Sequence, residues 1–377
     1  MKIVHVFHNY YPVVGGLERA VQSLAEELAK MGHEVHVITG RFGAGNRSKE
    51  EVINGVYVHR VKALRFLFPD LTYPLEYVEN VLRDADIVHG HSQNSLFTVK
   101  IIEKAKSLGV ETAMYFMAVD ALYDHPNPLV RFLGPYYAKY VLRKAIGLSD
   151  IRFVRSLRDR EILSKKYGVE AVFIPDGVSE QLLSHRYCGD KFRSLYGIDC
   201  DYVLYVGRLH PLKGVDVLIK ALHHIVENSI NLKLVVIGPG NAERYRELAQ
   251  KLGVDKNVLF LGFVDEETKI CAIDGSLAVI VPSVCDYVEV YPMIISEAWA
   301  RNKAVIATRV GGIPYRVKHM VNGLLVPPKD PKALARAIIM LSQNKKLAIK
   351  LGVEGRKEIM TWREVAIKML NTYKGYA

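Results

Sequence analysis

The feature that most constrains the fold of this chain is an alternation of short, apolar, β-rich runs with helical stretches. In the first half such runs occur at 3–7, 34–38, 55–61, 86–90, 111–116, 151–154 and 171–174. In the second half the alternation starts afresh, with runs at 201–207, 232–238, 257–262, 277–283 and 304–308. Strands buried on both faces and separated by helices are typical of parallel sheets covered on each side. The sequence therefore predicts an α/β protein with two doubly wound domains that face a central cleft.

The domain boundary is predicted in the irregular segment 175–198, which carries Pro175 and Gly177. On this basis the first domain covers residues 1–180 and the second covers 195–357. The segment 361–373 has an amphipathic helical pattern. We expect the C-terminal helix, about 358–377, to be able to return and pack on the first domain.

Composition excludes several classes of protein. The chain has 377 residues, which is enough for two hydrophobic cores. No stretch approaches the ~20 apolar residues of a membrane-spanning helix. The N-terminus enters a strand pattern without the apolar run of a secretion signal, so a cytoplasmic location is expected.

The cysteines at 188, 200, 271 and 285 form no C-x-x-C pair. This spacing predicts reduced thiols rather than a zinc site or a disulfide framework.

The net charge of +11 favours anionic partners. Nucleic acid is not expected, because the charge is spread along the chain and no binding signature accompanies it. The segments 60–68 and 151–166 combine cations with apolar residues, a pattern suited to anionic lipid or to an acceptor with a lipid phosphate. A solvated basic face explains the same pattern slightly better. Peripheral contact with the inner face of the membrane therefore stays open.

The segment VGRLHPLKG, at 206–214, has the features of an anion site. A strand is predicted to end at Gly207, Arg208 follows, and Lys213 stands just before a glycine that opens a helix. A glycine lets backbone amides approach a ligand, and a helix N-terminus favours negative charge. Two cations here would neutralise a diphosphate, including the charge that grows as it departs. An ordinary surface turn with two solvated cations is an equally good interpretation of this segment taken alone.

The segment DYVEVYPMIISEAWA, at 286–300, places two carboxylates around a predicted helix start. Pro292 is typical of the beginning of a helix, so Met293 and Ile294 can present free amide donors. Glu289 precedes that start and Glu297 lies in the first turns. A carboxylate in this position can accept two hydrogen bonds from a ribose diol, although an exposed helix residue would look the same.

The second half resembles the donor domain of retaining glycosyltransferases of family 4 (group 1), which have the GT-B fold of two Rossmann-like domains. The resemblance rests on ordered motifs over most of 202–340, including LKLVVIGPG, NVLFLGFV, VIVPS and NGLLVPPKDPKALARAI. In the first half it rests on VVGGLERA (13–20), DIVHGHS (86–92) and PDGV (175–178).

The resemblance implies a nucleoside diphosphate sugar as donor, with no cofactor and no metal. It implies that Arg208 and Lys213 bind the diphosphate and that Glu297 binds the ribose. Glu289 and the amides of Met293 and Ile294 would lie near the donor sugar. The remaining implied donor contacts are Gly207, the backbone of Phe263 and Val264 facing the base, and Gly16 approaching the phosphate.

The chain departs from the family pattern at residue 117. The family commonly has a histidine after the strand that corresponds to 111–116, whereas this chain has Met117. A methionine thioether can neither donate a hydrogen bond nor exchange a proton. We expect Met117 to shape the sugar or acceptor pocket and His91 or Asp120 to supply polar contacts. His89 and His91 lie at the C-terminal end of a predicted strand, where a purely structural role is the alternative.

Three other functions have less support in the sequence. A catalytically impaired nucleotide-sugar-binding protein of the same fold remains the alternative, because of Met117. A nicotinamide-dependent dehydrogenase is disfavoured, since the chain has no G-x-G-x-x-G after its first strand. A sugar-nucleotide epimerase would need an acid–base pair that the first half does not show. The sequence leaves the base, the sugar, the acceptor and the oligomeric state open.

Overall fold

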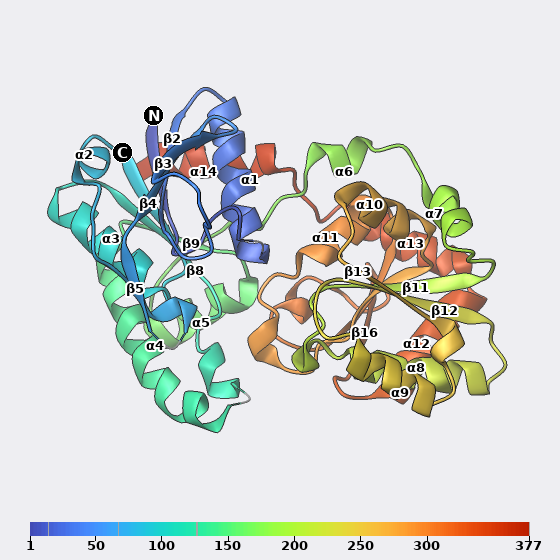
Figure 1. Cartoon of the computed structure of the whole chain (residues 1–377). Helices are drawn as coiled ribbons and strands as arrows, with labels where there is room; N and C mark the ends of the chain where they lie inside the picture. The colour runs from blue at the N-terminus through green and yellow to red at the C-terminus, as the bar shows by residue number, and fades with distance from the viewer. Residues whose placement is uncertain (14, 67, 126, 377) are drawn as a thin grey trace. The chain divides into compact units, whose positions relative to one another are not determined.

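The computed structural model describes all residues except 14, 67, 126 and 377. It divides into two compact units, one formed by Met1–Gly177 with Met360–Ala377 and the other by Val178–Ile359 (Figure 1). No helix within the described ranges is long and apolar enough to cross a membrane.

The first unit is built on a sheet with the strand order β10-β9-β8-β7-β1-β2-β4-β3. All of its neighbouring strands pair in parallel except β3 and β4. The strands are β1 (Lys2–Val6), β2 (Glu34–Gly40), β3 (Glu50–Ile53), β4 (Val56–Val61), β7 (Ile87–His91), β8 (Thr112–Phe116), β9 (Ile151–Val154) and β10 (Val172–Phe173). A separate antiparallel pair is formed by β5 (Ala63–Arg65) and β6 (Thr72–Pro74).

The second unit is built on a parallel sheet with the order β13-β12-β11-β14-β15-β16. Its strands are β11 (Asp201–Val206), β12 (Leu232–Ile237), β13 (Val258–Gly262), β14 (Ala278–Val281), β15 (Ala304–Thr308) and β16 (Leu324–Val326). Alternate residues of β11 enter different cores. Val203 and Tyr205 pack with α8 (Val215–Glu227) and α12 (Pro331–Gln343), whereas Tyr202 and Leu204 pack with α10 (Glu266–Gly275) and α11 (Met293–Ala300). The predicted double-sided α/β architecture is therefore confirmed.

The helices of the first unit are α1 (Gly16–Lys30), α2 (Glu79–Arg83), α3 (Leu96–Ser107), α4 (Pro128–Leu148), α5 (Leu157–Tyr167) and α14 (Trp362–Tyr376), with 3-10 turns η1 (Pro69–Leu71) and η2 (Ala121–Asp124). Those of the second are α6 (Glu180–Ser184), α7 (Gly189–Leu195), α8 (Val215–Glu227), α9 (Glu243–Lys251), α10 (Glu266–Gly275), α11 (Met293–Ala300), α12 (Pro331–Gln343) and α13 (Lys345–Arg356). The second unit also has the 3-10 turns η3 (Pro211–Lys213), η4 (Asp255–Asn257), η5 (Asp286–Val288) and η6 (Ile313–Tyr315).

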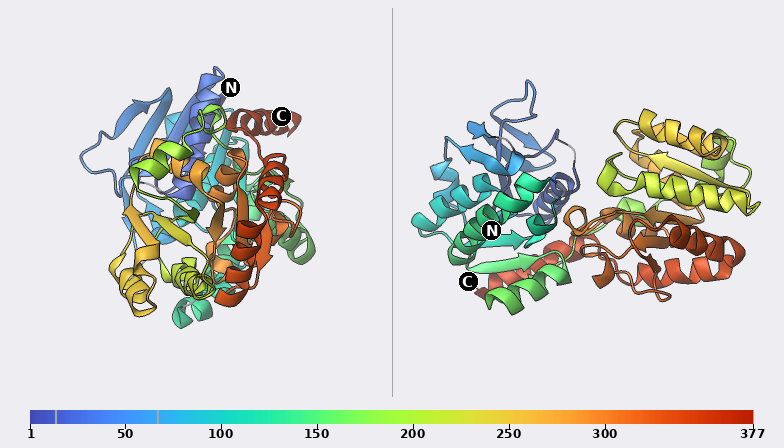
Figure 2. Two further views of the ribbon diagram at one scale, coloured as in Figure 1. Left: turned by 90° about the vertical axis from the view of Figure 1, so that its right-hand side faces the viewer. Right: turned by 90° about the horizontal axis from the view of Figure 1, so that it is seen from below.

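The C-terminal helix α14 lies against α1 in the first unit, as both views of Figure 2 show. Its Tyr373 is buried, and the phenol oxygen lies 2.6 Å from Nδ1 of His89 in β7. Since Tyr373 and His89 are 284 positions apart, this hydrogen bond ties the end of the chain to the central sheet.

The segment after Gly177 belongs to the second unit, because several contacts fix it there. A disulfide joins Cys188 to Cys271 in α10. Arg301 donates hydrogen bonds to the carbonyl oxygens of Leu182 and His185. The prediction of reduced thiols is wrong for these two cysteines. No sequence pattern indicates this pairing, because 83 positions separate the two cysteines and the packing of α7 on α10 brings them together. Cys200 and Cys285 are not part of a disulfide.

Candidate active site

The loops that follow β11, β12 and β13 are joined at the carboxyl end of the second sheet. The amide of Gly207 donates to Ile237 (2.9 Å), that of Leu209 to Pro239 (2.8 Å), and that of Gly238 to Gly262 (2.7 Å). Gly238 has φ +138°, and a Cβ atom there would lie 2.0 Å from the Gly207 oxygen. Only glycine fits such an approach. The strands thereby hold the segment from Gly207 in place at the edge where doubly wound folds bind ligands.

Lys213 and Glu289 meet at this edge. The Lys213 ammonium lies 2.7 Å from Oε1 of Glu289, and the same oxygen accepts a hydrogen bond from the Ser283 hydroxyl. Glu289 is only 3% exposed, whereas the Lys213 side chain is partly accessible. A buried carboxylate needs such partners, because an unpaired charge in the interior is costly. The pair joins the two segments that the sequence singled out separately.

The loop that carries Glu289 is held by two glycines that follow β15. The Gly311 amide donates to Oδ1 of Asp286 (2.7 Å), and the Gly312 amide donates to the Glu289 carbonyl (2.8 Å). Gly311 has φ +53°, and a Cβ atom there would lie 2.0 Å from the Glu289 oxygen. Gly311, Gly312 and Asp286 were not among the predicted site residues. The GG pair in ATRVGGIP was the available signal for the first two.

Arg208 is exposed, and a hydrogen bond from Tyr205 holds its backbone. The Tyr205 hydroxyl donates to the Arg208 carbonyl at 2.8 Å. Burial, assisted by the Glu289 charge, raises the pKa of Tyr205, while the Arg208 charge opposes that rise. Arg208 and Glu289 therefore both lie near this phenol. Within the described part of the chain, the Arg208 guanidinium has no carboxylate within 4.0 Å, so its charge is available to a ligand.

Glu297 is already paired. Its carboxylate lies 2.9 Å from the ammonium of Lys269 in α10, and Glu266 lies 2.8 Å from the same ammonium. Burial lowers the pKa of Lys269, but the two carboxylates outweigh burial and the net pKa is raised. Sequence reasoning missed Lys269. Its charge orients the carboxylate of Glu297 while leaving other oxygen lone pairs open to a hydroxyl donor.

The other predicted donor residues of the second unit lie at the start of α11 and just after β13. Met293 and Ile294 form the first turn of α11, after Pro292 as N-cap. Phe263 and Val264 follow β13, with Phe263 69% exposed and Val264 packed on the core. An exposed aromatic ring beside a strand end is suited to contact with a planar base. Gly16, in the first unit, begins α1, and a Cβ atom there would meet no atom within 4 Å.

Met117 follows β8 in the first unit and is half-buried. The buried Gln93 amide holds its backbone from both sides: Oε1 accepts from the Met117 amide (2.9 Å) and Nε2 donates to its carbonyl (2.8 Å). The position of residue 117 is thus fixed independently of its side chain. Asp120 accepts hydrogen bonds from Lys166 and Tyr167 of α5, so it is held by protein partners.

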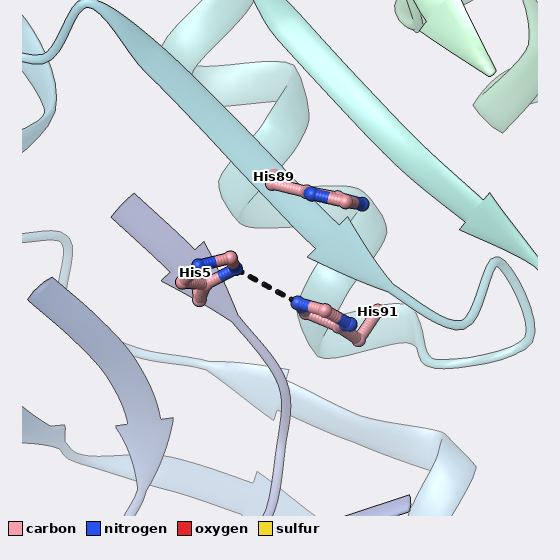
Figure 3. A group of neighbouring side chains, drawn as sticks. All are labelled: His5, His89 and His91. Atoms are coloured by element: carbon pink, nitrogen blue, oxygen red, sulfur yellow. Dashed lines mark hydrogen bonds between the residues drawn. The ribbon is translucent and has the colours of Figure 1, made fainter. Parts of the chain in front are cut away.

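His91 is fully buried, so the expectation that it contacts the acceptor is corrected. Arg155 donates to its Nδ1 (3.3 Å), and its Nε2 lies 2.9 Å from Nδ1 of His5 (Figure 3). Because a guanidinium only donates, Nε2 of His91 carries the proton and donates to His5. Burial, followed by the charges of His89, His5 and Arg155, lowers the pKa of His91. His91 is therefore a neutral structural side chain.

One nitrogen from each of His5, His89 and His91 lies within 4.8 Å of the others, which is the spacing of a metal site. Burial lowers the pKa of His5 to about 3, so its imidazole is neutral, as ligation requires. The Arg155 guanidinium beside His91, however, would repel a divalent cation. Arg155 is in turn paired with the buried Asp176 at 3.2 Å. The arrangement fits a hydrogen-bonded core better than an ion site.

Comparison with known proteins gives matches over both units. The family model described as glycosyl transferases group 1 matches residues 195–358, and that described as Glycosyltransferase Family 4 matches 14–182. An uncharacterized glycosyltransferase of Methanocaldococcus jannaschii is 28% identical over 99% of this chain and 98% of its own. A D-inositol 3-phosphate glycosyltransferase of Xylanimonas cellulosilytica is 26% identical over 95% of this chain and 91% of its own.

Solved structures show the same fold. Sucrose-phosphate synthase from Thermosynechococcus elongatus has a TM-score of 0.79 at 23% identity, covering 99% of this chain and 98% of that one. Anabaena HepE, solved in complex with UDP, has a TM-score of 0.78 at 20% identity over the whole of both chains. Two Rossmann-like units with these matches define a glycosyltransferase of the GT-B fold. The chain belongs to the group 1, family 4 glycosyltransferases, which confirms the resemblance drawn from its motifs.

Proposed function

We propose that this chain is a retaining glycosyltransferase that moves a hexose from a nucleoside diphosphate sugar to an acceptor hydroxyl. The observation that carries the proposal is the contact of Lys213 with Glu289 at the carboxyl end of the second sheet. It places a cation suited to a diphosphate beside a carboxylate suited to a sugar. HepE, a protein of the same fold, was solved with UDP and with UDP-glucose, which supports a uridine or similar diphosphate donor.

In this proposal different residues of the second unit contact different parts of the donor. Arg208 and Lys213 bind the diphosphate and stabilise the negative charge that grows as the bond to the sugar breaks. Glu289 and the amides of Met293 and Ile294 contact the sugar, Glu297 the ribose, and the backbone of Phe263 and Val264 the base. Because two cations neutralise the diphosphate, we propose that no metal ion is required.

The chemistry proposed for the acceptor needs no protein nucleophile. The acceptor hydroxyl attacks from the face that the diphosphate leaves, and the departing phosphate oxygen takes the hydroxyl proton. Met117 then shapes the pocket without exchanging a proton. Asp120 orients the acceptor through the carboxylate lone pairs that Lys166 and Tyr167 do not use. The approach of Gly16 to the donor phosphate stays a prediction.

Binding of UDP tests the assignment of Glu297. Glu297→Gln is expected to weaken UDP binding by about 1.5–3 kcal/mol, because a charge-assisted hydrogen bond to the ribose is lost. Isothermal titration calorimetry with UDP measures this change. A nucleoside diphosphate should also raise the melting temperature of the wild type more than the free nucleoside does.

The matched control is Glu266→Gln, which removes the other carboxylate from Lys269 and leaves Glu297 in place. This variant should bind UDP as the wild type does. Equal losses in the two variants would mean that the Lys269 cluster acts only on structure, and the ribose assignment would fail.

A further inference from the structure

Helix α4 presents a continuous apolar stripe to solvent. Five large side chains, each 54 to 73% exposed, follow one another at spacings of three, one, three and four residues: Leu129, Phe132, Leu133, Tyr136 and Tyr140. These spacings place them on one face of a helix. Single exposed apolar residues are common, but a stripe of five indicates a surface that binds something.

The opposite face of α4 fixes the stripe in its outward orientation. Val141, Leu142 and Ala145 are buried, and the helix packs on α3 and η2. The Tyr137 hydroxyl donates to the Asn94 carbonyl at 2.9 Å, and the Asn127 side chain caps the first turn. The stripe is therefore not the face that α4 packs against the core of its own unit.

The charges on α4 itself are all positive. Helix α4 contains Arg131, Lys139, Arg143 and Lys144 and no acidic residue. Lys144 pairs with Glu103 at 2.6 Å. The other three are exposed, and in the described residues none of them has a carboxylate within 4.0 Å. Lys139 and Arg143 lie three positions after Tyr136 and Tyr140, at the border of the stripe.

In the segments that the sequence suggested for lipid contact, most of the cations have partners within the protein, although Arg160 is exposed. In 60–68, Arg60 is buried against Glu51, and Arg65 donates to Asn9 and Thr72. In 151–166, Lys165 pairs with Glu161 and Lys166 with Asp120. The sequence shows these cations but not the partners that the fold gives them, and lipid contact at these two segments stays a prediction.

We propose that α4 docks on an anionic membrane surface. The helix, about 30 Å long, lies parallel to the bilayer with its stripe among the headgroups and the first acyl carbons, while Lys139 and Arg143, at the border of the stripe, contact lipid phosphates. Tyrosine rings suit this depth because they have an apolar body and a polar tip. A second copy of the chain is a poorer partner, since two such faces would set cations against cations.

Vesicle co-sedimentation of the full chain tests the proposal. Wild type is expected to bind vesicles of phosphatidylcholine with phosphatidylglycerol and not vesicles of phosphatidylcholine alone. Phe132→Ser/Tyr136→Ser, which leaves the charge unchanged, should weaken binding about tenfold or more. Lys139→Gln/Arg143→Gln should weaken it roughly tenfold as well. All these side chains are exposed, and unchanged melting temperatures verify that the variants fold.

Two controls separate local docking from the general attraction of a protein with net charge +11. Lys346→Gln/Lys350→Gln removes two exposed cations from α13, and Ile349→Ser/Val353→Ser removes two exposed apolar side chains from the same helix. Both should bind as the wild type does. The proposal is overturned if wild type does not bind the anionic vesicles, or if the α13 variants lose as much binding as the α4 variants. It is also overturned if Phe132→Ser/Tyr136→Ser converts a wild-type dimer to monomers in lipid-free sedimentation, because the stripe would then join two copies.

Discussion

Lys213→Met is expected to lower turnover about 10²- to 10³-fold, the usual loss when one preorganised group that stabilises a developing anion is removed. The ammonium lies 2.7 Å from Glu289 and is partly accessible, so it can reach both this carboxylate and a bound diphosphate. Methionine keeps most of the side-chain volume and removes the charge. Steady-state release of nucleoside diphosphate from the donor measures the effect.

The ion pair complicates this experiment, because Lys213→Met leaves the buried Glu289 carboxylate with Ser283 as its remaining partner. Part of the loss could then come from instability. The double variant Lys213→Met/Glu289→Gln separates the two effects. It should regain thermal stability over Lys213→Met and remain inactive. Recovery of turnover in the double variant would show that Lys213 serves only to neutralise Glu289, and the diphosphate role would be wrong.

Gly311→Ala is expected to reduce turnover about 100-fold, although residue 311 is not assigned a contact with the donor. The new Cβ atom would lie 2.0 Å from the Glu289 carbonyl oxygen and 2.9 Å from that of Asp286. The loop must move to relieve this clash, and Glu289 moves with it. A displacement of about 1 Å in a positioned group can cost about 100-fold in rate. Turnover and UDP affinity, measured on the same preparation, give the result.

Gly253→Ala is the matched control for this variant. Gly253 has φ +67° in the same unit, and a Cβ atom there meets no atom within 4 Å. It therefore bears the left-handed backbone cost of about 1–2 kcal/mol without a clash. The two variants should lose comparable backbone stability, but only Gly311→Ala should lose activity. Similar turnover in both variants would show that the position of the loop around Glu289 does not matter for the reaction.

The fold was largely predictable because buried parallel strands leave a strong apolar signal. Every predicted run overlaps a strand of the structure, from β1 to β15. The strands that were missed are short or lie at edges: β3 pairs antiparallel at the end of its sheet, and β16 has three residues. Helices α6 and α7 were missed inside the predicted boundary, because their attachment depends on Cys271 and Arg301 far along the chain.

The candidate site was predictable in its residue types and not in its pairings. The motifs pointed to Lys213 and Glu289, but 76 positions separate them and sequence alone does not show their contact. Lys269 is not part of a motif that the sequence singled out. Its role in orienting Glu297 follows from the structure, where Glu297 and Glu266 both lie within 3 Å of its ammonium. His91 looked accessible because it ends a strand, whereas Arg155 and His5 cover both of its nitrogens.

We expect this chain to transfer a sugar with Met117 in place of the histidine that its family commonly has. Release of nucleoside diphosphate from a panel of nucleotide sugars, with and without candidate acceptors, by wild type and by Met117→His, measures this directly. Wild type should turn over at least one donor, because the proposed reaction needs no histidine at 117. Donor binding by wild type without turnover, together with turnover by Met117→His, would show that the chain has lost its chemistry.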